Sequence, residues 1–152
     1  MAQTNWQDYL KLMAGLGRTL EQLTKVEREK TAAAVQGDLP AVEECMKREQ
    51  VLSLTLRGHD QKRENMLRAL GLKGVSLSQL EAHSPEEFRL ETKAAVEELR
   101  RQYSLFQAAS EVARDTLEVN LRAIERIQAA RVGDAVQAEE QRKTARQTDF
   151  RA

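Results

Sequence analysis

A single apolar stripe with helical spacing runs through the second half of the chain and constrains its fold most. Its positions are separated alternately by four and three residues, and from residue 92 they are Thr92, Val96, Leu99, Tyr103, Phe106, Ser110, Ala113, Leu117, Asn120, Ile124 and Ile127. This spacing keeps all these side chains on one face of a slightly underwound helix. The stripe predicts one long helix that opens at Ser84-Pro85 and meets no strong stop before Gly133.

Two shorter helices should precede it, over residues 5–36 and 39–70. The first has heptad-spaced apolar residues, which are Trp6, Tyr9, Met13, Leu16, Leu20 and Leu23. Gly37 is a typical left-handed helix end and Asp38 a typical helix start. So short a connection forces the two helices into an antiparallel hairpin.

Two details of this hairpin follow from the pattern. The apolar stripe of the first helix meets Glu27 and Lys30, so it either shifts sideways to Val26 and Ala33 or becomes hydrated there. Folding about the Gly37-Asp38 turn also sets Gly17 opposite Gly58, where two glycines would allow close backbone approach.

A short helical turn should connect the hairpin to the long helix, because Ser76-Leu77-Ser78-Gln79 has the pattern of a capping box. The sequence therefore predicts an all-α fold, an antiparallel three-helix bundle or coiled coil with a short connecting helix and a long third helix. Residues 1–132 would form the bundle domain, and residues 133–152 a polar C-terminal tail.

The third helix is too long for the hairpin. Each hairpin helix would span about 48 Å and the third about 70 Å. The third should reach the Gly37-Asp38 tip near residue 116. The large apolar residues beyond that point are Leu117, Leu121, Ile124 and Ile127. Burial of each would contribute on the order of 1.5–3 kcal/mol. A foreign helix or a second copy could cover them. Alternatively, the helix bends at Ala108-Ala109-Ser110 and covers them itself.

Composition excludes several classes of function. The 24 basic and 24 acidic residues cancel, which leaves no electrostatic footprint for nucleic acid or anionic lipid. No apolar stretch reaches the roughly twenty residues needed to span a bilayer, and we expect no secretory signal. One cysteine, Cys45, cannot form an internal disulfide, which agrees with a reducing cytosol.

We expect no enzymatic chemistry, metal or cofactor. His59 and His83 lie on different elements without a cysteine partner, and His59 should be solvated within a charged run. Cys45 has no basic neighbour placed to lower its pKa, so it reads as a small core residue. Gly15 and Gly17 lie within a helix and do not form a phosphate-binding loop.

The middle of the chain carries a series of short motifs in a fixed order. A glutamate-rich helix ends in Gly37-Asp38-Leu39, and a second helix carries Lys47 and Arg63. Gly71-Leu72 and Leu77-Ser78-Gln79-Leu80 follow. This order and spacing resembles the FlgN family of bacterial flagellar export chaperones, in layout over about residues 5–130.

The resemblance implies a cytoplasmic chaperone that binds the C-terminal helices of the hook–filament junction proteins FlgK and FlgL. It would keep them unpolymerised and deliver them to the flagellar type III export gate. The implied binding surface lies in the C-terminal part, and together with the stripe it gives the candidate residues Ala113, Leu117, Asn120, Leu121, Ile124 and Ile127. The Tyr-then-Gly tail motif of many family members is missing, which leaves Phe150 as a candidate for docking at the gate.

A second hypothesis is a self-associating coiled-coil scaffold without a role in export. In it, two copies bury each other's overhanging residues and form a tight dimer. A chaperone is instead expected to be a monomer or a weak homodimer when no substrate is bound.

Overall fold

The computed structural model describes residues 5–144, and of residues 124, 127, 128, 131, 134, 135, 143 and 144 it describes the backbone alone. Its elements are helix α1 (Trp6–Val35), helix α2 (Leu39–Ala69), helix α3 (Leu77–His83), the 3₁₀ turn η1 (Glu86–Phe88) and helix α4 (Arg89–Thr144). No strand occurs within residues 5–144. The predicted all-α fold is therefore confirmed.

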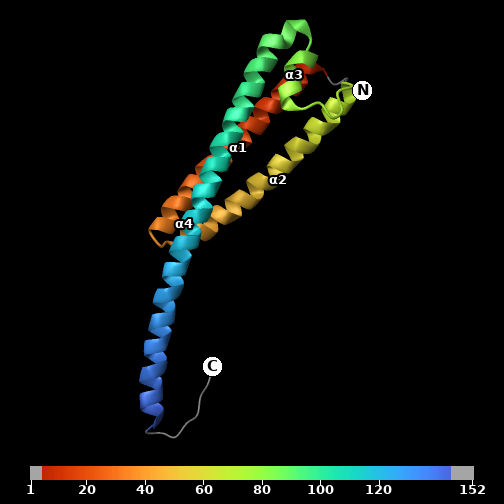
Figure 1. The fold of residues 1–152 in the computed structure, drawn as a ribbon. Coiled ribbons are helices and arrows are strands. Elements are labelled where there is room, and N and C mark those ends of the chain that lie inside the picture. The colour runs from red at the N-terminus through yellow and green to blue at the C-terminus, as the bar shows by residue number, and fades with distance from the viewer. Residues whose placement is uncertain (1–4, 145–152) are drawn as a thin grey trace.

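The three long helices are arranged as an up-down-up bundle (Figure 1). α1 and α2 form an antiparallel hairpin, and α4 starts beside the first turns of α1 and runs in the same direction. α1 packs against both α2 and α4, while α3 and η1 pack against α4 at the open end of the hairpin. This confirms the bundle and the short connecting helix.

The hairpin turns where the sequence predicts it. Gly37 has a φ of 69°, a left-handed conformation that costs glycine little. The side chain of Asp38 accepts a hydrogen bond from the backbone N–H of Ala41 at 3.2 Å, and thereby caps α2. α3 begins with the predicted capping box of Ser76 and Gln79.

The core is divided between two clusters along the bundle. The larger lies toward the open end and contains Trp6, Tyr9, Met13, Leu16, Leu20, Leu67, Leu80, Val96 and Leu99. The smaller lies at the tip, where Ala33, Ala34 and Val42 are buried and Leu117 of α4 packs against them. The prediction that the long helix meets the tip near residue 116 agrees with this contact.

α4 is continuous from Arg89 to Thr144 and does not break at Ala108-Ala109-Ser110. The alternative in which the helix bends there and folds back is therefore wrong. Gly133 does not end the helix either, because a single glycine costs only about 1 kcal/mol relative to alanine. Neither finding tests the proposed domain boundary after residue 132, which stays a prediction.

Glu27 and Lys30 lie inside the bundle and are not hydrated. Both are buried, as are Val26 and Ala33. The ammonium Nζ of Lys30 lies 3.2 Å from Oε2 of Glu27 and 2.6 Å from Oε2 of Glu49 on α2. One cation is thus shared between two carboxylates, so α1 buries both its apolar stripe and these charges.

Two further expectations about the hairpin are wrong. Gly17 does not face Gly58, because the nearest atom to a Cβ on Gly17 would be Cγ of Gln102 on α4, and Gly58 has open space around it. His59 is half-buried, with Cε1 3.5 Å from where a Cβ on Gly15 would lie. Its Nδ1 is buried without a hydrogen-bond partner.

Candidate functional site

The segment of α4 beyond the hairpin is the candidate functional site. Among the side chains of α4 that the structure describes, Leu117 is the last that packs against a core cluster. The helix then continues to Thr144, roughly 27 residues or about 40 Å at 1.5 Å per residue. We call residues 118–144 the overhang. In Figure 1 it extends past the α1–α2 turn with no other helix beside it.

The sequence-predicted site divides at the tip of the hairpin. Ala113 is 0% exposed, so it belongs to the interior and not to an accessible surface. Leu117 is half-buried on the tip cluster. Asn120 is also half-buried, and its Nδ2 donates to the backbone oxygen of Thr116 at 2.8 Å. Ala113 and Leu117 thus end the covered part of the stripe, and Asn120 is its first residue on the overhang.

The rest of the predicted site lies on the overhang or beyond it. Leu121 is 38% exposed although it is a large apolar residue. Ile124 and Ile127 belong to the helical backbone of the overhang. Phe150 lies outside the described residues. The structure thus places Leu121, Ile124 and Ile127 on one uncovered helix, and their role in binding stays a prediction.

Sequence reasoning missed two apolar residues further along the same helix. Val132 is 60% exposed and Val136 is 47% exposed. They follow Leu121 by 11 and 15 residues, both close to whole numbers of helical turns, so the three positions share one face. The predicted stripe was followed only as far as Ile127, and the expected stop at Gly133 left Val136 outside the helix. A plain 3.6-residue periodicity carried through the glycine would have found it.

The overhang is a well-formed helix whose charges are mixed. Arg122 pairs with Glu118 one turn earlier, at 2.6 Å between Nη2 and Oε1, and both side chains are exposed. Such i,i+4 pairs contribute only about 0.3–0.5 kcal/mol each. Basic and acidic residues are interspersed in nearly equal numbers along residues 122–143, so no single sign of charge dominates the surface. Apolar burial is therefore the main attraction that the overhang can offer.

The thiol of Cys45 and possible metal ligands are the reactive groups to consider elsewhere in the described chain. Cys45 is buried, and its burial raises the pKa of the thiol above its ordinary value, which disfavours the nucleophilic thiolate. Within residues 5–144 no group of three or more His, Cys, Asp or Glu side chains could hold a metal ion.

Among the helices described in this structure, none combines the length and the hydrophobicity needed to cross a bilayer.

Comparison with known proteins adds one match. A family model described as "FlgN protein" matches residues 1–141, which is most of the chain and includes the overhang as far as residue 141. No curated protein and no solved structure matches the chain.

Proposed function

The chain belongs to the FlgN family, whose members are flagellar export chaperones, and from this premise we propose that its overhang binds the C-terminal helices of hook–filament junction proteins. The substrates would be FlgK and FlgL. Binding would keep their helices from pairing with each other before export. In this proposal the protein acts in the cytoplasm and hands its substrate to the flagellar type III export apparatus.

The observation that carries the proposal is the uncovered apolar face of α4. Leu121, Val132 and Val136 are exposed on one side of a helix that the bundle does not support. A partner helix laid along this face would bury the apolar stripe of α4 against its own apolar stripe. This is the usual mode of recognition for amphipathic helices. Burial of each of the three residues would contribute on the order of 1.5–3 kcal/mol.

A double substitution tests the site. Leu121→Asp with Val132→Asp should abolish binding of a peptide from the C-terminal helix of a junction protein, measured by isothermal titration calorimetry. The matched control is Leu90→Asp with Val112→Asp, which places the same two changes at exposed positions of α4 alongside the bundle. The control should bind as the parent does. Unchanged affinity in the overhang variant would rule out the site.

The scaffold hypothesis rests on the same uncovered face, with a second copy as the occupant. Light scattering across a range of protein concentrations distinguishes the two. A monomer that forms a one-to-one complex with the junction peptide supports the chaperone. A tight dimer that the Leu121→Asp, Val132→Asp variant converts to a monomer supports the scaffold.

Docking at the export gate is a separate part of the proposal. Phe150 is the large apolar residue of the sequence that follows the overhang, and we assign gate docking to it in place of the missing Tyr-then-Gly motif. Phe150→Ala should leave peptide binding unchanged and reduce secretion of the junction proteins in a flagellated host. Normal secretion in that variant would exclude this role.

A further inference from the structure

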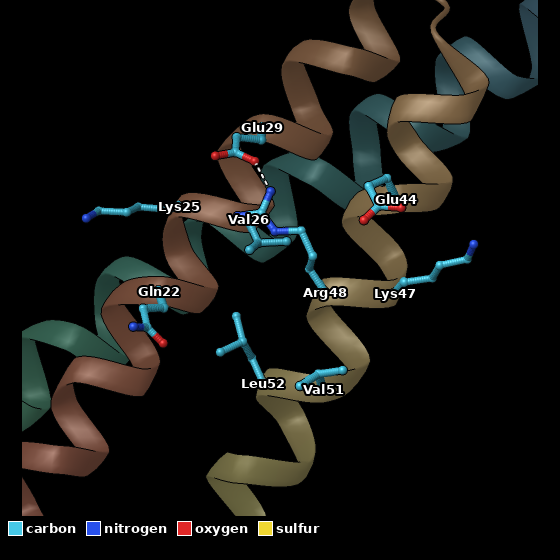
Figure 2. Close-up of a pocket in the computed structure, with 9 residues that line it drawn as sticks. All are labelled: Gln22, Lys25, Val26, Glu29, Glu44, Lys47, Arg48, Val51 and Leu52. Atoms are coloured by element: carbon cyan, nitrogen blue, oxygen red, sulfur yellow. Dashed lines mark hydrogen bonds and ion pairs between the residues drawn. The ribbon is translucent and has the colours of Figure 1, made fainter.

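The hairpin has a second accessible surface, on the side that α4 does not cover. There α1 and α2 enclose a groove of about 540 Å³ that spans roughly two turns of each helix. Figure 2 shows this face, with α4 behind the two hairpin helices. The groove begins about one turn from the tip cluster and is separate from the overhang, which lies beyond the Gly37-Asp38 turn.

The floor of the groove is apolar. Val26 of α1 is buried at its base, and Leu52 of α2 is half-buried beside it. Val51 lines the α2 wall and is 65% exposed. Exposure of this apolar side chain to water is unfavourable, and valine also has a low helix propensity. At one end the guanidinium of Arg48 pairs with the carboxylate of Glu29, which joins α2 to α1 across the groove (Figure 2).

Each rim of the groove carries one lysine. Lys25 extends outward from α1 and Lys47 extends outward from α2 (Figure 2). Within residues 5–144 neither lysine has an ion-pair partner, whereas Arg48 and Glu29 neutralise each other. Glu44 is the remaining charged residue of the lining, so the unpaired charges sum to a positive value.

The shape and the charges together indicate one kind of occupant. Three helices leave this hairpin face open, and a fourth helix laid in the groove would complete a four-helix bundle. Its apolar side would rest on Val26, Val51 and Leu52, and acidic residues on its two flanks would reach Lys25 and Lys47, as flanking charges do in coiled coils. We propose that the groove binds an amphipathic helix with acidic flanks, supplied by a partner protein.

The charges disfavour a second copy of this chain in the groove. A two-fold pairing of the hairpin faces would bring two surfaces of the same positive sign together, which is unfavourable. A small ligand fits poorly as well, because the polar groups lie on the rims and do not converge over the floor. An amphipathic helix with acidic flanks would cover the apolar floor and pair with the lysines on the rims.

The test uses two synthetic peptides and the full chain. Both peptides are amphipathic helices of about five turns with leucines on one face, and they differ in having glutamate or lysine on the flanks. Fluorescence anisotropy should show the glutamate peptide binding about tenfold more tightly than its lysine twin. Lys25→Glu with Lys47→Glu should reverse this preference. Lys11→Glu with Lys93→Glu, the same change at exposed lysines outside the groove, should keep it.

Two further variants separate this site from the overhang. Leu121→Asp with Val132→Asp should bind the glutamate peptide as the parent does, whereas Val51→Asp should weaken it about tenfold. The proposal is overturned if the two peptides bind equally, or if only the overhang variant loses binding. A dimer that Val51→Asp dissociates would also overturn it, since a second copy would then occupy the groove.

Discussion

The indole Nε1 of Trp6 donates a hydrogen bond of 2.8 Å to Oγ1 of Thr92, inside the bundle and across 86 positions of sequence. The Thr92 hydroxyl donates in turn to the backbone oxygen of Phe88, also at 2.8 Å. These two bonds fix the start of α4 beside the start of α1. They therefore help to determine which residue of α4 meets the tip of the hairpin.

Thr92→Val should destabilise the protein. The substitution keeps the shape of the side chain but leaves the buried indole N–H of Trp6 without an acceptor, at a cost of about 1–3 kcal/mol. Urea unfolding followed by the fluorescence of Trp6 measures the change. Thr55→Val is the matched control, because Thr55 is exposed and its hydroxyl bonds only to Val51 of its own helix. Equal losses in both variants would contradict the assigned role of Trp6.

Glu27→Gln should stabilise the protein more at pH 7 than at pH 4. Burial raises the pKa of Glu27 above its ordinary value, Glu49 adds to this, and Lys30 opposes it. In the unfolded protein the pKa of Glu27 is near 4.5, and in the folded protein it is higher. The protonated carboxyl therefore contributes stability below pH 4.5, and this stability is lost as the pH rises through the pKa of the folded protein. Glutamine carries no such pH-dependent cost.

Chemical unfolding at several pH values measures this effect as the difference in free energy between Glu27→Gln and the parent. The difference should grow in favour of glutamine from pH 4 to pH 7. Glu43→Gln, a change at an exposed residue of α2, should give a difference that stays nearly constant. A difference at Glu27 that shrinks toward pH 7 would mean that Lys30 outweighs the burial of the carboxylate.

Ala113→Leu should cost about 1–3 kcal/mol, because the position is fully buried and a larger side chain would overpack the interface. Ala123→Leu makes the same change at an exposed position of the overhang and should leave stability nearly unchanged. Thermal unfolding followed by circular dichroism measures both. If the two variants unfolded at the same temperature, Ala113 would not be part of the interior.

Deletion of residues 123–152 should leave the bundle folded with nearly the same unfolding midpoint, because Leu117 is the last of the described side chains of α4 that packs against a core cluster. The shortened protein should nonetheless lose its binding to junction-protein helices. Urea unfolding and calorimetry check the two parts separately. A large fall in the midpoint would show that the overhang supports the bundle.

Much of the fold could be predicted from local signals. Gly37 and Asp38 mark the hairpin turn, Ser76 and Gln79 the connecting helix, and the length of the hairpin places the contact with Leu117 within a residue of the expected position. These features depend on backbone chemistry and helix geometry, which a sequence expresses directly.

The side-chain details of the interfaces were less predictable. Glu27 is buried beside Lys30 of its own helix, and Lys30 also pairs with Glu49 of α2, an arrangement that the sequence pattern does not show. Gly17 faces Gln102 of α4 and not Gly58, because it lies on a different side of α1 from Gly15, which faces His59 of α2. For the candidate site, spacing found Leu121 but missed Val132 and Val136, since the stripe was followed only as far as Ile127.

The separation of the overhang from both core clusters has an evolutionary consequence. Substitutions in the overhang change the surface offered to other proteins but should change the small free energy of unfolding of the bundle very little. Under the proposed function, preference for one export cargo over another would therefore drift through residues such as Leu121 and Val132 while the body of the protein is conserved. The bundle and the overhang are therefore free to diverge at different rates.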